Sequence, residues 1–485
     1  MTRRPGAIRV TADAIAWGRV SSVEAVTECL RRISVLDGPI NSVVALRAEQ
    51  ALDEARSVDE SLARGEVVGP LAGVPVLVKD YEDVAGMPTR RGSVALRDAA
   101  PASSDEVVPA LLRRAGAVIV GKTNLPEFAV EGFTDNLLDG ATGNPWSLAW
   151  TPGGSSGGSG AALAAGLAPI ATGTDGGGSV RIPAGACGLV GLKPTHGAVG
   201  RWPVADWIDY STYGPMATTV ADTRLLFSLM AGIVAGDPSS APWLPGADPS
   251  EASFPSGAGS SGRRPSHLLV AERTAAMGPL PSSVASAFAD AVARAAALWD
   301  VEVRTLDPAG LFGDIGDPDH DWFTVAPAEH VASLGRAWVE EHMSELHPSS
   351  QAFLGAGLEV SIDDYLACRR RRPAYTHRLD TLLGESGVLL TPTLAVEGLL
   401  ADGRVSADAA FEPTGPEVYS TAIQNITGHP AVSVPAGVHP SGLPYGLQLT
   451  TARWSDLWLL DLAAQWETAY PWQLVAPGYE EFTLA

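Results

Sequence analysis

The run PGGSSGGSGAALAAGLAPIATGTDGGGSVRIPAGACGLVGLKPT, residues 152–195, holds two glycine–serine clusters separated by a segment of small apolar residues. The clusters are GGSSGGS at 153–159 and GTDGGGS at 173–179. Glycine lets the backbone turn sharply and approach a ligand closely. Apolar segments frame both clusters, which favours a buried catalytic site over the alternative of two flexible loops.

Lysine is rare in this chain. Of the 33 basic residues only Lys79, Lys122 and Lys193 are lysines, and all three lie near the two clusters. Arginine stays protonated in proteins, whereas a lysine whose pKa is lowered can act as a base. We predict Lys79, in GVPVLVKD, as a general base, and we interpret Lys122 and Lys193 as ion-pairing or loop-anchoring residues.

The second cluster combines the parts of an acyl-transfer site. A serine hydroxyl needs a neighbouring base to become a nucleophile, and the oxyanion that forms needs N–H donors aimed at it. Ser179 would supply the nucleophile, Asp175 would hold the loop, and Ser155 would relay the proton to Lys79. The predicted oxyanion hole consists of the backbone N–H groups of Gly176, Gly177, Gly178 and Ser179. An amide-bond hydrolase is the function that this pattern favours.

Two other glycine motifs compete for the first cluster. A phosphate-binding loop requires lysine after GxxxxG, but Ser159 follows Gly153–Gly158, so this motif is excluded. The segment 153–157 also matches the GxSxG elbow of α/β-hydrolases, with Ser155 as an esterase nucleophile. Trp150-Thr151-Pro152 is a poor strand before that elbow, and an esterase of this type stays a second alternative.

Composition bounds the class of protein. The chain has 485 residues, 46% of them hydrophobic, which is enough for a large core, and a formal net charge of −22, which disfavours nucleic acid as a partner. No apolar stretch is long enough to span a membrane, and residues 1–18 do not resemble a signal peptide. Three widely separated cysteines indicate reduced thiols. We therefore expect a cytoplasmic enzyme that contacts no membrane.

Helix and strand patterns alternate along the chain, which is typical of an α/β protein. We expect helices at 1–70, a catalytic core at 71–232, a Pro/Gly/Ser-rich loop at 233–266, and the remainder of the same domain at 267–485. Strands are predicted at Val74–Val78, Ala117–Val120, His267–Ala271, Val301–Thr305, Gly387–Leu390, Ala431–Pro435 and Gly446–Thr450. Helices are predicted at Ala45–Arg64, Glu106–Ala115, Ser159–Leu167, Ser282–Leu298 and Leu457–Glu467. Since core elements occur on both sides of the loop, one large domain over residues 1–485 is favoured.

The run at 152–195 resembles the signature of the amidase signature family. Further matching motifs follow in the family's order: GVPVLVKD (73–80), GAVIVGKTNLPEF (116–128), GNPW (143–146), GPMATTVAD (214–222), LLTPT (389–393), NITGHPAVSVPAG (425–437) and GLPYGLQL (442–449). The resemblance spans nearly the whole chain. It implies one compact α/β domain with a central mixed twisted sheet covered by helices on both faces.

The resemblance also implies roles for residues. Ser179 would be the acylated nucleophile, Ser155 the bridging serine after a cis Gly154–Ser155 peptide, and Lys79 the general base. Ser156, Asp175 and Arg181 would support these three. Such an enzyme hydrolyses a small-molecule amide, or a carbamate or ester, to an acid and an amine, and it requires neither a metal nor an organic cofactor. A homodimer stays open.

Within this family a glutaminase subunit of a tRNA-dependent amidotransferase is the alternative. The approach to GPM in this chain, DWIDYSTY at 206–213, lacks the serine-rich pattern of that subunit, so a free-standing amidase is favoured. A non-catalytic binding protein is disfavoured because all three reactive residues are present. Aromatic residues that could wall an acyl pocket, or serve only as core or surface, are Trp202, Trp207, Tyr210, Tyr213 and Trp322. The acidic stretch 317–321 is interpreted as a solvated loop.

Overall fold

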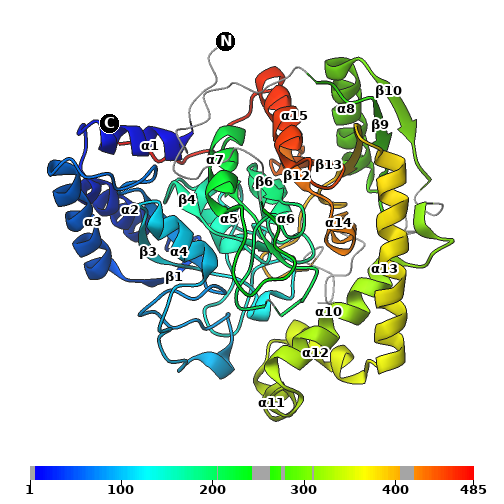
Figure 1. The fold of residues 1–485 in the computed structure, drawn as a ribbon, viewed down its shortest axis with the longest axis horizontal. Helices are drawn as coiled ribbons and strands as arrows, with labels where there is room; N and C mark the ends of the chain where they lie inside the picture. The colour runs from blue at the N-terminus through cyan, green and yellow to red at the C-terminus, as the bar shows by residue number, and fades with distance from the viewer. Residues whose placement is uncertain are drawn as a thin grey trace.

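The computed structural model describes residues 6–204, 206–242, 263–274, 279–307, 311–404 and 420–484. Its centre is a mixed 11-stranded sheet with the order β1-β3-β2-β4-β8-β6-β12-β13-β11-β9-β10 (Figure 1). Strands from both sides of the predicted 233–266 loop join this one sheet, as a single domain requires. Most of that loop, residues 243–262, lies outside the described residues.

The strands of this sheet are short. They are β1 (Val43–Leu46), β2 (Pro75–Lys79), β3 (Val118–Thr123), β4 (Ile170–Ala171), β6 (Val190–Lys193), β8 (Met216–Ala217), β9 (His267–Val270), β10 (Glu302–Thr305), β11 (Gly387–Pro392), β12 (Ala431–Val438) and β13 (Pro444–Thr450). A separate two-stranded sheet joins β5 (Thr174–Asp175) to β7 (Thr212–Tyr213). Parallel pairing of β2 with β3 and β4, and antiparallel pairing of β12 with β6 and β13, make the sheet mixed.

Helices cover both faces of the sheet (Figure 1). They are α1 (Ala7–Ala16), α2 (Ser22–Leu36), α3 (Ala48–Ala63), α4 (Val107–Arg114), α5 (Gly157–Ala164), α6 (Arg181–Cys187), α7 (Val220–Met230), α8 (Ser282–Trp299), α10 (Pro318–Leu334), α11 (Arg336–His342), α12 (Pro348–Glu359), α13 (Ile362–Leu383), α14 (Ala422–Thr427) and α15 (Asp456–Ala469). Figure 1 shows α10 to α13 gathered at one end of the molecule, beside α14.

Two of the hydrophobic cores lie on opposite faces of β2. In β2, Val76 and Val78 enter the core shared with α4, α7, α8 and α15, whereas Leu77 enters the core shared with α2, α3, α5 and α6. Successive side chains of a strand point to opposite faces, so a strand buried on both faces reads as a continuous apolar run. That is the pattern from which β2 was predicted.

Most predicted elements are confirmed within a few residues. The exception near the N-terminus is Ala45–Arg64, which was predicted as one helix. The structure places Val43–Leu46 in the edge strand β1, paired antiparallel with β3, and begins the helix α3 only at Ala48. Val43 and Val44 are β-branched and favour an extended backbone, a preference that the neighbouring helical pattern masked.

The acidic stretch 317–321 is not a solvated loop, so that interpretation is wrong. Asp317 caps α10 by accepting hydrogen bonds from the backbone N–H groups of Asp319 and His320. Asp321 is 1% exposed and pairs with Arg371 of α13. A capped helix N-terminus favours carboxylates, and the arginine compensates the buried charge.

The fold makes a prediction about stability. Leu447 on β13 is fully buried in the core beside α15 and α8, so Leu447→Ala should lower the free energy of unfolding by about 2–5 kcal/mol. Leu148, which is 43% exposed, is the matched control, and Leu148→Ala should change it by less than about 1 kcal/mol. Urea denaturation measures both, and equal losses would contradict this placement of the core.

Candidate active site

The amine of Lys79 lies within hydrogen-bonding distance of two hydroxyl groups. β2 delivers Lys79 to the centre of the molecule, where its Nζ lies 2.7 Å from Ser155 Oγ and 2.9 Å from Thr174 Oγ1. Its backbone N–H also donates to Thr172 Oγ1 at 3.0 Å. A neutral amine has one lone pair, so it can accept the Ser155 proton while donating to Thr174. The predicted contact between Lys79 and Ser155 is therefore present in the structure.

Burial sets the charge state of this amine. Lys79 is 0% exposed, and burial lowers the pKa of its ammonium to about 7 against the opposing charges of Glu82 and Asp175. Glu82 is buried beside it and accepts a hydrogen bond from the Thr172 hydroxyl. Burial and the charge of Glu106 raise the pKa of Glu82 to about 8. A substantial fraction of Lys79 is therefore neutral near pH 7, as a base must be.

The first glycine–serine cluster touches the second through Ser156. The Gly154–Ser155 peptide is cis, as the resemblance implies. The next N–H, of Ser156, donates to the carbonyl of Ser179 at 3.2 Å, and the Ser156 hydroxyl lies 3.4 Å from the carbonyl of Thr174. Ser156 thus joins the chain that carries Ser155 to the chain that carries Ser179. Ser179 is 7% exposed, so it is the more accessible of the two predicted reactive serines.

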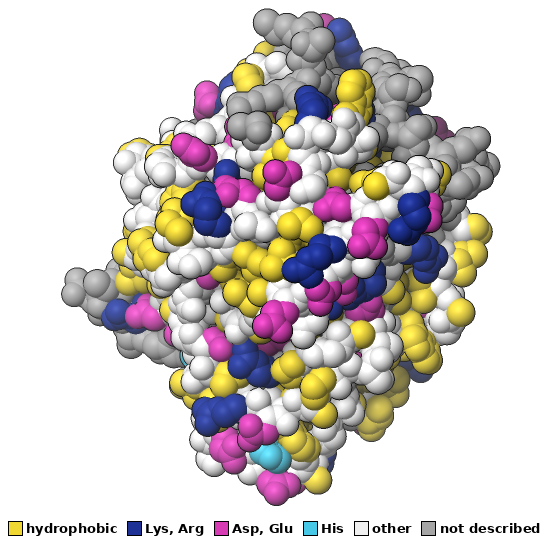
Figure 2. Space-filling view, turned by 90° about the vertical axis from the view of Figure 1, so that its left-hand side faces the viewer, with side chains coloured by type: hydrophobic (Ala, Val, Ile, Leu, Met, Phe, Trp, Pro, Cys, Tyr) yellow, Lys and Arg dark blue, Asp and Glu magenta, His cyan; other side chains and the backbone are white. Residues whose placement is uncertain are grey.

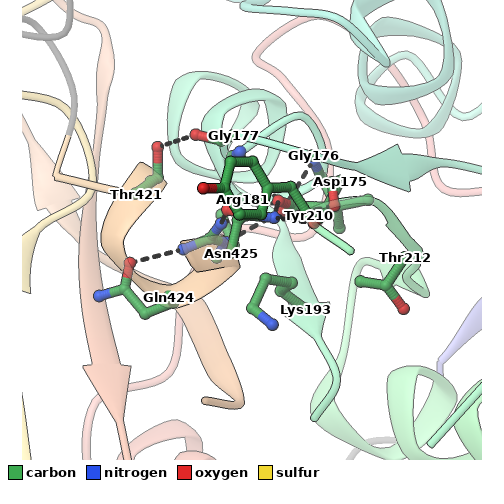
Figure 3. A network of polar contacts seen from close by, with 12 residues as sticks. Asp175, Gly176, Gly177, Arg181, Lys193, Tyr210, Thr212, Thr421, Gln424 and Asn425 are labelled. Atoms are coloured by element: carbon green, nitrogen blue, oxygen red, sulfur yellow. Dashed lines mark hydrogen bonds and ion pairs between the residues drawn. The ribbon is translucent and has the colours of Figure 1, made fainter. Parts of the chain in front are cut away.

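A buried ion pair holds the Ser179 loop from behind (Figure 3). Arg181 and Asp175 are both 0% exposed, and their guanidinium and carboxylate form a two-pronged contact with N–O distances of 2.8 and 2.9 Å. Burial alone would raise the pKa of Asp175, but the Arg181 charge and hydrogen bonds from Arg181 and Asn425 lower it to about 2. The carboxylate therefore stays charged and keeps the loop fixed.

Three side-chain amides from the C-terminal third of the chain complete this network, and Figure 3 labels two of them, Gln424 and Asn425. Arg181 also donates to the side-chain oxygens of Gln424, Gln448 and Asn425 at 3.0, 2.8 and 2.6 Å. Asn425 donates back to the backbone and side chain of Asp175. A guanidinium has five N–H donors, and this arrangement satisfies them without water.

One predicted oxyanion donor is already engaged. The backbone N–H of Gly178 donates to Asp175 Oδ1 at 2.8 Å, so it cannot also point at a substrate oxygen. In the described part of the chain, the N–H groups of Gly176, Gly177 and Ser179 make no such bond. The sequence showed four consecutive backbone N–H groups, but it could not show that the Asp175 carboxylate would accept a hydrogen bond from one of them.

The other two lysines have different surroundings. Lys122 pairs with Asp80 at 3.2 Å and donates to Thr89 and the Pro88 carbonyl, as expected of an ion-pairing residue. Lys193 lies beside the Arg181 network and donates to the Pro194 carbonyl at 2.8 Å (Figure 3). Burial, with the charge of Arg181, lowers its pKa to about 7. Neither contacts Ser155 through a hydrogen bond.

The five predicted aromatic residues differ in burial and contacts. Trp207 and Trp322 are 7% and 6% exposed, form a T-shaped pair with ring centres 5.4 Å apart, and pack against Gly176 and Gly177. Trp202 is 54% exposed and does not join them. Tyr210 and Tyr213 are buried. Sequence reasoning grouped all five together because it had no information on register in residues 200–213.

Several residues that shape the site were not predicted. They are Thr172, Thr174 and Glu82 around Lys79, and Gln424, Asn425 and Gln448 around Arg181. The GTD and NITGHP motifs contained Thr174 and Asn425, and a polar side chain that becomes buried requires a hydrogen-bonding partner. No group of three or more His, Cys, Asp or Glu that could hold a metal ion occurs among the described residues.

Comparison with known proteins identifies the family. The family model named Amidase matches residues 24–304 and 336–460. The chain belongs to the amidase signature family. It is therefore related to hydrolases that act on C–N bonds, and the mixed, helix-covered sheet predicted from the signature is confirmed.

The relatives and structural neighbours are consistent with this membership. A Mycobacterium bovis protein named "Putative amidase AmiB2" is 36% identical over 91% of both chains. A glutamyl-tRNA(Gln) amidotransferase subunit of a Synechococcus species is 35% identical over 97% of both. A bacterial aryl acylamidase of the amidase signature family superposes with a TM-score of 0.84 at 27% identity, covering 96% of each chain.

The molecular surface is mixed in character. On the face turned to the viewer in Figure 2, acidic and basic side chains are interleaved with apolar ones. Among the described helices, none is both long and apolar enough to cross a membrane.

The α/β-hydrolase elbow that was considered for the first cluster lacks its strand, because residues 151–154 adopt no strand before Ser155.

The pH dependence of activity follows from Lys79. Because the base must be neutral and burial lowers its pKa to about 7, kcat/KM should rise as pH increases through about 7 and then level. Initial rates on an amide substrate between about pH 5 and 9 measure this limb. A midpoint near the ordinary lysine value of about 10.4 would contradict a buried amine whose pKa is lowered to about 7.

The protonation state of Glu82 predicts how that limb responds to its removal. Burial raises the pKa of Glu82 to about 8, so its carboxyl is largely protonated where Lys79 titrates, and Glu82→Gln should leave the midpoint of the acid limb of kcat/KM within about half a unit. Asp222→Asn is the matched control, because Asp222 is also buried and bonds the Ile8 backbone rather than a residue of the site. A fall of the midpoint by about one unit or more in Glu82→Gln would show that Glu82 is charged beside Lys79.

The contribution of the Asp175–Arg181 ion pair can be tested by measuring the free energy of unfolding. Arg181→Met leaves the Asp175 carboxylate buried without its partner and should lower the free energy of unfolding by about 3–5 kcal/mol. Arg56→Met removes an exposed pair with Asp53 and should cost about 1 kcal/mol or less. Chemical denaturation compares them. Similar losses would mean that Arg181 has no special structural role.

Proposed function

We propose that this chain is a free-standing amidase that hydrolyses carboxylic amides through an acyl-enzyme on Ser179. The observation that carries the proposal is the fully buried Lys79 amine at 2.7 Å from Ser155 Oγ, beside the loop that carries Ser179. Family membership supports C–N bond hydrolysis. The roles of the three residues and the substrate class are our proposal.

The proposed first half-reaction forms the acyl-enzyme. Neutral Lys79 takes the Ser155 proton while Ser155 takes the Ser179 proton, and Ser179 Oγ attacks the amide carbon. The N–H groups of Gly176, Gly177 and Ser179 stabilise the oxyanion; Gly178 is left out because its N–H is bonded to Asp175. Lys79 then returns the proton through Ser155 to the leaving nitrogen, the C–N bond breaks, and the amine departs.

The second half-reaction uses the same groups in reverse roles. Water replaces the amine, Lys79 removes its proton through Ser155, and hydroxide attacks the acyl carbon on Ser179. Collapse of the second tetrahedral intermediate releases the carboxylic acid and returns the proton to Ser179 Oγ. The products are one acid and one amine or ammonia, and none of these steps routes through a metal or an organic cofactor. Esters and carbamates could pass through the same steps.

A glutaminase subunit is the second candidate, favoured by the 35% identity to the Synechococcus amidotransferase protein over 97% of both chains. The two functions differ in their need for a partner. A free-standing amidase turns over simple amides alone, whereas a glutaminase of that kind acts on glutamine and depends on partner proteins. The neighbouring aryl acylamidase makes aryl amides the first substrates to test.

Covalent labelling tests the proposed function. A fluorophosphonate should add once to the wild-type protein and not to Ser179→Ala, as read by intact mass, and Lys79→Ala should slow labelling by at least about 100-fold. Purified protein alone should hydrolyse at least one member of a panel of anilides and aliphatic amides. Labelling of Ser155 with Ser179→Ala still reactive would contradict the assignment of the nucleophile.

A further inference from the structure

Two side chains from outside the signature hold the carbonyl groups of the Ser179 loop. The indole Nε1–H of Trp322 donates to the Gly176 carbonyl at 2.9 Å. The Thr421 hydroxyl donates to the Gly177 carbonyl at 2.5 Å (Figure 3). Trp322 lies on α10, and Thr421 lies immediately before α14. Hydrogen bonds therefore hold the carbonyl oxygens of two consecutive peptide groups in this loop.

A hydrogen bond that fixes a backbone carbonyl also fixes the direction of the N–H group of the next residue. In a planar trans peptide the C=O of one residue and the N–H of the next point in opposite directions. Fixing the Gly176 oxygen against Trp322 therefore fixes the Gly177 N–H on the other side of the chain. The same reasoning applies one residue later: Thr421 holds the Gly177 oxygen, and the Gly178 N–H points instead to Asp175 Oδ1 at 2.8 Å.

Close packing prevents the loop from rotating away from these donors. A Cβ at Gly177 would lie 2.8 Å from Trp322 Cζ2, and a Cβ at Gly176 would lie 2.0 Å from Trp207 Cε3. Both distances are too short for real carbon contacts, so the two indole rings occupy the space that side chains at these positions would need. Glycine is required here by close approach of the indoles.

Trp322 is itself held in place. Its neighbour Asp321 is buried and bonded to Arg371 and Tyr375 of α13, which fixes this turn of α10 on the molecule. The ring also packs on Trp207 and Phe353. Residues 305–335, which include Trp322, lie between the two segments that match the family model. A segment outside the matched regions thus contacts the backbone of the reactive loop.

We propose that Trp322 is a positioning residue for oxyanion stabilisation, acting through its hydrogen bond to the Gly176 carbonyl to aim the Gly177 N–H at the reacting carbonyl oxygen. Thr421 has the companion role one peptide later, where it turns the Gly178 N–H toward Asp175. This inference rests on the proposed acyl-enzyme function. The inference adds that a residue of α10, outside the signature motifs, helps to set the geometry of the oxyanion hole.

The test removes one hydrogen bond and keeps an aromatic ring. Trp322→Phe should lower the maximal rate constant of Ser179 phosphonylation by a fluorophosphonate about tenfold, and leave the half-saturating concentration within about twofold. The loss is smaller than the about 100-fold or more expected for deleting an oxyanion donor outright, because the Gly177 N–H is only misaimed. The same ratio should appear in kcat, with KM nearly unchanged, for an anilide that the wild type hydrolyses.

The matched control is Trp466→Phe. Trp466 is also buried and its indole N–H donates to the Pro435 carbonyl at 2.9 Å, but it lies on α15 within a different core. This variant should lose similar stability and keep the wild-type rate constant. A merely structural role for Trp322 would make the two variants alike.

A second pair of variants keeps the inference testable if Trp322→Phe folds poorly. Thr421→Val removes the hydroxyl at nearly constant volume and should also lower the maximal rate constant, whereas Thr421→Ser keeps the hydroxyl and should restore it to within about twofold of wild type. Equal rate constants for Thr421→Val and Thr421→Ser, or a Trp322→Phe rate within about twofold of wild type, would overturn the proposal. Failure of the wild type to label at Ser179 would overturn the proposed function and this positioning role with it.

Discussion

Burial of the Lys79 amine is the constraint on which the rest of the site depends. An ammonium group taken out of water is costly, so the amine loses its proton near neutral pH and becomes a base. The chain meets this requirement with hydroxyl partners, Ser155 and Thr174, that serve either charge state of the amine. Small residues follow the first cluster: every residue of α5, from Gly157 to Ala164, is buried, and the helix packs against α6 and β4. An arginine at position 79 could not perform this role, because it would stay charged.

The second requirement is a loop that does not move. The Asp175–Arg181 pair is deeply buried, and its cost is offset only because both charges are fully hydrogen-bonded. The partners come from α14 and β13, more than 200 residues later in the chain. In the sheet the early strand β6 lies beside the late strand β12, which pairs in turn with β13. The fold brings the C-terminal third of the chain, including Thr421, to the signature segment. Helix α10 brings the indole of Trp322 to the same loop.

The sequence predicted the parts of this structure that depend on local pattern. Apolar runs marked β2, β3 and β11 to β13, and the motifs led to the prediction of Lys79, Ser155 and Ser179 as the reactive residues. What it missed depends on three-dimensional geometry. Asp175 lies only three residues before Gly178, but a run of glycines does not show which of its N–H groups turns toward that carboxylate. Nothing near residues 317–321 shows that Arg371, 50 residues later, compensates the charge of Asp321. Thr174 and Asn425 were inside recognised motifs, but their roles follow only from what the fold places beside them.

The central claim is that Lys79 loses its proton near pH 7, and the scarcity of lysine makes this directly measurable. Labelling the side-chain nitrogens of lysine should give three Nζ resonances from the whole protein, one for each lysine in the chain. Loss of one resonance in Lys79→Met assigns it, and its chemical shift can then be followed against pH by NMR. The account predicts a midpoint of about 7 for the Lys79 resonance. A Lys79 amine that stays protonated to beyond about pH 9 would contradict the account, because such a group could not serve as the base.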